Sequence, residues 1–156
     1  MESLGRIVSR LGKLRSLRIG AALLDGGDTS SKADAGLSCA LTGFTLCLAQ
    51  HYRVDASYFG RILAGSRRSL RKLVVAEHQI LPGELATVLG EFGGGLEELT
   101  VVASEYFKSK ISNTLSNSRN DLPHLRSLEL ATKFVLTAAN FDLLAQLPSL
   151  TRLRLS

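Results

Sequence analysis

Residues 125–130 read LRSLEL and residues 150–155 read LTRLRL, and each segment follows a Leu-Pro pair that begins three residues earlier. Both segments have the form leucine, two variable residues, apolar residue, one variable residue, apolar residue. The form occurs six times along the chain, at Leu14-Leu17-Ile19, Leu41-Phe44-Leu46, Leu70-Leu73-Val75, Leu96-Leu99-Val101, Leu125-Leu128-Leu130 and Leu150-Leu153-Leu155. The first leucines of successive copies are separated by 27, 29, 26, 29 and 25 residues. Such regular spacing indicates an internal repeat.

A second position supports the same register. In repeats of this form an apolar residue is expected five residues after the last apolar position of each copy. The five places that the chain reaches hold Leu24, His51, Ile80, Tyr106 and Val135. Four of these five residues are apolar or aromatic, so the repeat extends beyond the leucine segments themselves.

The pattern predicts short parallel strands in one sheet, at about residues 16–19, 44–47, 72–75, 98–101, 127–130 and 152–155. Between the strands, apolar residues recur at helical spacing and predict inward helix faces: Phe59-Ile62-Leu63, Leu85-Val88-Leu89-Phe92, Phe107-Ile111-Leu115 and Phe141-Leu144-Ala145. Pro82 and Gly83 mark the start of the second face. Asp55 or Ser57 is a candidate cap for the first helix, and Thr137 is the candidate cap for the last.

The composition bounds the function classes. The chain has 156 residues, of which 45% are hydrophobic and 21% charged, with a net charge of +5. These values favour one packed domain and exclude a disordered chain. There is no stretch long enough to span a bilayer and no secretory apolar core, so we expect a cytoplasmic or nuclear protein. Leu4, Ile7, Val8 and Leu11 share a basic amphipathic stretch, which leaves a mitochondrial targeting helix open.

The repeat resembles the leucine-rich repeat superfamily, and repeats of 25–29 residues with intervening helices resemble its ribonuclease-inhibitor-like branch. The resemblance extends from about Leu11 to Leu155. It implies one α/β domain over residues 1–156, a horseshoe-shaped solenoid with a parallel sheet on the concave face and helices on the convex face. LPHLRSLEL (122–130) and LPSLTRLRL (147–155) are similar to segments of F-box proteins, in which the repeats hold the substrate of a ubiquitin ligase. No F-box is recognisable in this chain.

The chain departs from that family in several places. The family's turn asparagine or cysteine is replaced at Ala22, Ala49, His78, Ser104 and Lys133, so we expect irregular turns without an asparagine ladder. Asp25–Gly36, rich in Gly, Ser and Asp, stands where the first helix would be and predicts a loop. The chain stops at Ser156, directly after the last repeat. We therefore expect a fragment of a longer array, or self-association through an uncapped C-terminal end.

The resemblance places the partner on the concave sheet, where alternate strand residues point outward. The central outward column is Arg18, Thr45, Val74, Thr100, Glu129 and Arg154, and its neighbour is Ser16, Gly43, Lys72, Glu98, Ser127 and Arg152. From these columns we select as candidate partner-binding residues Arg18, Lys72, Val74, Glu98, Thr100, Glu129, Arg152 and Arg154. Their mixed charges predict a polar protein partner and do not favour a phosphate backbone.

Other reactive or charged residues are interpreted as structural. Arg67, Arg68 and Arg71 read as a solvated loop, with contact to an acidic partner or nucleic acid left open. The spacing of Cys39 and Cys47 fits no metal motif, and we expect no catalytic pair between Cys47 and His51. Gly93, Gly94 and Gly95 lack the lysine and serine of a phosphate loop and predict a flexible turn.

The sequence therefore predicts a protein-binding scaffold with no catalytic residue, cofactor or metal. Substrate recognition in an F-box-type ubiquitin ligase is the specific role that the resemblance implies. The alternative is a regulator of an enzyme, either an activator of a small GTPase or an enzyme inhibitor of the leucine-rich-repeat type. An activator needs an arginine at the rim of the solenoid, and several arginines are available.

Overall fold

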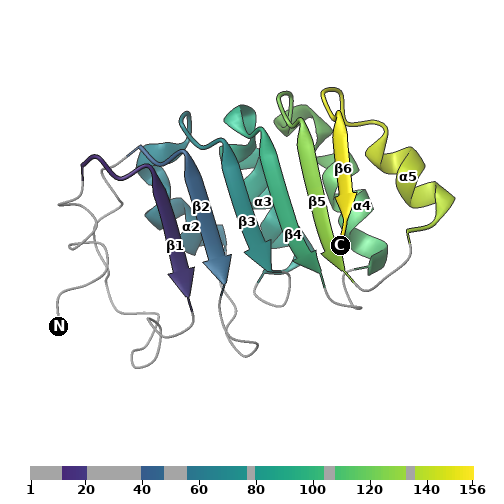
Figure 1. The fold of residues 1–156 in the computed structure, drawn as a ribbon, viewed down its shortest axis with the longest axis horizontal. Coiled ribbons are helices and arrows are strands. Elements are labelled where there is room, and N and C mark those ends of the chain that lie inside the picture. Colours follow the sequence, from purple (N-terminus) through teal and green to yellow (C-terminus); the bar gives the residue numbers. More distant parts are fainter. Residues whose placement is uncertain (1–11, 21–39, 48–55, 77–79, 104–107, 133–135) are drawn as a thin grey trace.

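The computed structural model describes residues 12–20, 40–47, 56–76, 80–103, 108–132 and 136–156. These residues form an α/β fold with one parallel sheet, in which six strands lie in chain order (Figure 1). The strands are β1 (Ser16–Gly20), β2 (Gly43–Cys47), β3 (Lys72–Ala76), β4 (Glu98–Ala103), β5 (Ser127–Thr132) and β6 (Arg152–Leu155). The six predicted strands are thus confirmed, as is their parallel pairing in a single sheet.

The helices lie together on one face of this sheet (Figure 1). They are α2 (Ala56–Ile62), α3 (Pro82–Phe92), α4 (Lys108–Asn117) and α5 (Ala138–Leu144). Each helix contacts the next one along the chain, so the helices form a second layer that follows the strand order. No helix in the described ranges is long and apolar enough to cross a membrane.

A row of shared backbone hydrogen bonds joins the repeats at the amino ends of the strands. One carbonyl oxygen in each repeat accepts from two successive amide groups of the next repeat. Arg15 O accepts from Thr42 N (2.7 Å) and Gly43 N (3.0 Å), and Thr42 O accepts from Arg71 N (2.8 Å) and Lys72 N (2.9 Å). Arg71 O accepts from Glu97 N (2.8 Å) and Glu98 N (2.9 Å), and Glu97 O accepts from Arg126 N (2.9 Å) and Ser127 N (3.0 Å). Arg126 O accepts from Thr151 N (3.0 Å) and Arg152 N (2.9 Å). We call this row the carbonyl ladder. It fixes the same register at every strand junction.

The leucine positions of the repeat form the core between the sheet and the helices. In the four inner copies all three apolar positions are buried, and Leu128 of β5 is 0% exposed. The outer copies are less covered: Leu14, Leu17, Leu150 and Leu153 are only partly buried, and Leu155 is 48% exposed. This gradient follows from the sheet order, because β1 and β6 each pair with one neighbour only.

Most of the predicted helix faces are confirmed. Leu85, Val88, Leu89 and Phe92 of α3 are all buried. The prediction for α5 is partly wrong: Leu144 is buried, but Phe141 is 43% exposed and Ala145 is exposed beyond the end of the helix. The physical reason is that α5 packs against α4 on one side, and no other helix in the described part of the chain covers its far side.

In the first and third helices the predicted faces also point inward. Phe59 and Leu63 are buried and Ile62 is half-buried, and the Phe59 ring packs edge-to-face on Phe44 with centroids 6.0 Å apart. Ile111 of α4 is buried, as is Leu115, whereas Phe107 lies outside the described residues.

The predicted cap of α5 is confirmed, whereas the prediction of Asp55 or Ser57 for α2 fails at Ser57 and stays a prediction at Asp55. Thr137 caps α5 through a capping box: its Oγ1 accepts from Asn140 N (3.4 Å), while Asn140 Oδ1 accepts from Thr137 N (3.0 Å). Ser57 is not a cap, because α2 already begins at Ala56. The amide of Ala56 instead donates to Glu84 Oε2 of the following repeat at 2.7 Å. The other candidate, Asp55, lies outside the described residues.

Several further predictions also fall outside the described residues. They concern the helix around Ile7, the loop Asp25–Gly36, and the irregular turns expected at Ala22, Ala49, His78, Ser104 and Lys133. Of the places five residues after each repeat, only Ile80 is described, and it is buried as expected. Self-association through the C-terminal end stays a prediction.

The triple glycine differs from the flexible turn that the sequence predicts. Gly93–Gly95 forms a 3₁₀ turn (η4) that continues directly from α3, and Gly93 is buried. A Cβ on Gly93 would lie 2.6 Å from the carbonyl oxygen of Asp121 and 3.0 Å from Leu122 Cδ2, whereas a Cβ on Gly94 would meet nothing within 4 Å. A glycine is therefore needed at position 93 because the next repeat packs closely against it, and not because the turn must be flexible.

We expect Gly93→Ala to lower the free energy of unfolding by about 1–3 kcal/mol, the usual cost of overpacking, because the backbone oxygen of Asp121 cannot turn aside. Gly94→Ala is the matched control and should change it by about 0.5 kcal/mol or less. Urea titrations of both variants measure the difference. Equal stabilities for the two variants would contradict the close approach at Gly93.

We expect Leu128→Asp to unfold the protein or to destabilise it by at least about 4 kcal/mol, because it places an unpaired charge between Leu99 and Leu153. Leu155→Asp makes the same change at a 48% exposed position and should cost about 1 kcal/mol or less. Thermal melts followed by circular dichroism compare the two. A parental melt for Leu128→Asp would show that this leucine is not in the core.

Candidate functional site: the strand face

The sheet has a helix-free face, and the two predicted columns both lie on it. The central column is in register across all six strands, as Arg18, Thr45, Val74, Thr100, Glu129 and Arg154. The neighbouring column is also in register, as Ser16, Gly43, Lys72, Glu98, Ser127 and Arg152. We call this surface the strand face. The sheet therefore brings residues from six separate repeats into two continuous rows.

The eight candidate residues are all at least partly accessible. Arg18, Lys72, Glu98, Arg152 and Arg154 are exposed, whereas Val74, Thr100 and Glu129 are partly covered by their neighbours. Of the inward residues between them, Leu73 and Leu99 are buried and Leu153 on the edge strand is partly buried, as strand alternation requires. A partner that lies on this face can therefore touch all eight without any rearrangement of the sheet.

Two ion pairs cross the strand face between neighbouring strands. Lys72 Nζ lies 2.9 Å from Glu98 Oε2, and Arg154 Nε lies 3.6 Å from Glu129 Oε1. The side chains of the first pair are 55% and 53% exposed, so water screens the attraction and the pair contributes about 1 kcal/mol or less. Such pairs can exchange their partner for a charge on another protein at little cost.

The ion pairs leave other charges of the face available. Among the described residues, none pairs with the guanidinium of Arg18 or with that of Arg152. The face thus offers two internally neutralised patches, on β3–β4 and on β5–β6, and two cations that pair with no described residue, Arg18 on β1 and Arg152 on β6. This arrangement suits a partner of mixed polarity, as the sequence predicts.

A third row of outward residues lies at the carboxyl ends of the strands and was not predicted from the sequence. Val102 of β4 is 42% exposed on the strand face and is in register with Ala76 of β3 and Ala131 of β5. The strands predicted at 16–19, 72–75, 98–101 and 127–130 end one or two residues before β1, β3, β4 and β5 do, so the prediction did not include this position. The signal was present in the alternation of Glu98, Thr100 and Val102 around the buried Leu99 and Val101. One end of the face is therefore charged and the other is small and apolar.

A shallow hollow of about 350 Å³ interrupts the neighbouring column. It forms where Gly43 has no side chain, and it is bordered by Ser16 on one side and by Lys72 and Glu98 on the other. Its lining offers hydroxyl, ammonium and carboxylate groups. The hollow can accept a polar side chain of a partner.

Among the described residues, no three or more His, Cys, Asp or Glu side chains come close enough together to hold a metal ion. His124 is exposed before β5, while His51 and His78 lie outside the described ranges. A shifted ionisation occurs away from the strand face, on α2. There burial raises the pKa of the Tyr58 phenol, against the opposing charge of Arg61. The absence of a catalytic residue and of a cofactor stays a prediction.

Comparison with models of known protein families finds no match, and comparison with curated proteins and with solved structures finds no similar chain.

Proposed function

We propose that the chain is a leucine-rich-repeat solenoid of the ribonuclease-inhibitor-like kind, and that its strand face binds another protein without catalysing a reaction. The observation that carries this proposal is the alignment of equivalent outward residues across six strands on the face that no helix covers. Repeat proteins use such extended surfaces for binding. The carbonyl ladder supports the repeat architecture, because the same bonds recur at every junction.

The size of the face bears on how a partner would bind. Six strands about 4.8 Å apart span about 29 Å, and three outward residues on each strand span about 20 Å, so the face covers roughly 600 Å². A stable protein interface uses about 800 Å² per partner. A partner of the strand face therefore also contacts the edges of the sheet.

Within this class, we propose substrate recognition in an F-box-type ubiquitin ligase as the specific role. The support is the similarity of residues 122–130 and 147–155 to segments of such proteins. Regulation of an enzyme, as by a small-GTPase activator or an enzyme inhibitor, is the alternative. Exposed arginines beside the sheet, such as Arg126, support that alternative.

The repeat architecture predicts an unusual response to deletion. Removal of residues 70–95 takes out one whole repeat and lets β2 pair with β4 through the same ladder, so the protein should keep one cooperative thermal transition at a lower midpoint. Removal of residues 83–95 alone is smaller, but it strips the helix from β3 and should abolish the transition. Circular dichroism melts compare the two. A shorter deletion that is better tolerated than the longer one would contradict the solenoid.

The binding role predicts where a partner can be trapped in cells. A photo-reactive amino acid at Thr100, on the strand face, should give a discrete adduct with a second protein. The same amino acid at Thr87, exposed on the helix side, should give none. Val102→Glu, which adds a charge to the apolar end of the face, should reduce the Thr100 adduct. Equal adducts from both positions would contradict the proposal.

The ubiquitin-ligase role is tested on the trapped protein. If that protein is a substrate, Val102→Glu should lengthen its half-life in cells in proportion to the lost adduct. An unchanged half-life would reject the adaptor role and leave the binding role intact.

A further inference from the structure

The residues of the carbonyl ladder also present a row of side chains at the amino ends of the strands. We call this row the amino rim, and it consists of Arg15, Thr42, Arg71, Glu97, Arg126 and Thr151. All six are exposed. Their backbones are bound from strand to strand, so the order and spacing of the side chains along the edge are fixed.

Arginines occupy every second place of the amino rim, beside β1, β3 and β5. Neighbouring strands lie about 4.8 Å apart, which separates successive rim arginines by about 9.5 Å. The places between them hold a threonine and Glu97. Positive charge therefore repeats along this edge at a regular interval. This regularity is not evident in the sequence, because two whole repeats separate each rim arginine from the next.

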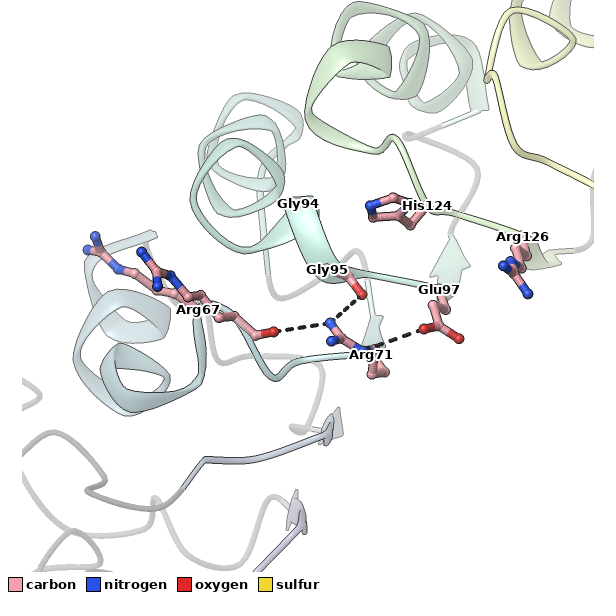
Figure 2. A pocket seen from close by; sticks show the side chains of 8 residues that line it. Arg67, Arg71, Gly94, Gly95, Glu97, His124 and Arg126 are labelled. Atoms are coloured by element: carbon pink, nitrogen blue, oxygen red, sulfur yellow. Dashed lines mark hydrogen bonds and ion pairs between the residues drawn. The ribbon is translucent and has the colours of Figure 1, made fainter.

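A hollow of about 470 Å³ lies at the centre of the amino rim. Figure 2 shows Arg71 and Arg126 on either side of Glu97, with His124 nearby above the strand ends. Arg71 is held from behind, because its Nη1 donates to Gly95 O (2.9 Å) and to Arg68 O (3.1 Å). The hollow thus has one arginine fixed by backbone carbonyls at its centre.

The arginine side chains around this hollow make few or long ion pairs with the described residues. Arg71 Nε lies 3.5 Å from Glu97 Oε1, and these two side chains are 45% and 49% exposed. Among the described residues, none pairs with the guanidinium of Arg126, and that of Arg15 contacts one group, the Leu14 carbonyl, at 3.5 Å. A ligand anion can therefore reach two guanidinium groups that no described carboxylate holds, and can compete with Glu97 for the third.

We propose that the amino rim binds an extended acidic segment of a partner protein, with a carboxylate at every third residue. A polyproline II segment has three residues per turn and rises about 3.1 Å per residue, so every third side chain points the same way at intervals of about 9.3 Å. This interval matches the spacing of Arg15, Arg71 and Arg126. Arginine suits the role because its planar fork can bind both oxygens of a carboxylate.

Charge on the neighbouring strands favours an acidic peptide over a nucleic acid. Glu97 lies within the rim and Glu98 beside it, so a continuous phosphate backbone would meet carboxylates as well as arginines. The described lining of the hollow contains no Phe, Tyr or Trp on which a base could stack, and its one ring is the imidazole of His124. A peptide with acidic residues only at every third place avoids these carboxylates.

The test uses a fluorescent peptide of glutamate–proline–proline repeated four times, titrated with the whole chain at low salt and followed by anisotropy. Arg126→Gln should weaken binding about two- to fivefold, the size of one exposed ion pair. Glu97→Gln should tighten it by a similar factor, because it frees Arg71. Arg61→Gln makes the same charge change as Arg126→Gln at an exposed site on α2, and should leave affinity unchanged.

Three outcomes would overturn the proposal. These are equal losses from Arg126→Gln and Arg61→Gln, no gain from Glu97→Gln, or equal affinity for a peptide of the same composition with its glutamates in one block. A short oligothymidylate that binds more tightly than the peptide, and depends on Arg126, would assign the rim to nucleic acid instead. Unchanged melts of the variants exclude misfolding. The titration needs no partner of the strand face, so a failed Thr100 adduct and a failed titration are separate results.

Discussion

Five backbone carbonyl groups set the register on which the rest of the molecule depends. Each accepts two successive amides from the next repeat, as the carbonyl of Arg71 does from Glu97 and Glu98. Because these bonds involve only the main chain, they place no demand on the side chains that carry them. The register is thereby constant while the residues at the amino ends of the strands vary freely among arginine, threonine and glutamate.

This constraint separates the residues that stabilise the fold from those available for binding. Inward positions must stay apolar, since the register stacks Leu99 on Leu128 and Leu128 on Leu153. Outward positions follow the same register but remain accessible to water, so Thr100 and Glu129 are neighbours that do not contribute to the core. A surface made in this way can change its chemistry repeat by repeat at little cost in stability.

Sequence reasoning succeeded where a feature repeats and failed where it depends on neighbours in space. Leu128 could be assigned to the core because its position recurs six times. Phe141 could not be placed correctly, because its exposure depends on how many helices flank α5. The role of Gly93 was hidden for a similar reason: its required contact is with Asp121, in the following repeat. The juxtaposition of Arg71 and Arg126 likewise emerges only when the strands are stacked.

The strand face and the amino rim differ in how far their charged side chains are paired, and this difference suggests separate roles in binding. On the strand face, Lys72 pairs with Glu98 and Glu129 with Arg154, so its field is short in range. On the amino rim, Arg126 pairs with no residue that the structure describes, and the Arg71–Glu97 pair is long and half exposed. Unpaired charge acts at a distance and raises association rates, whereas neutralised polar surfaces discriminate at contact. A partner with an acidic segment would therefore meet the rim first, and its fit to the strand face would then determine how long it stays.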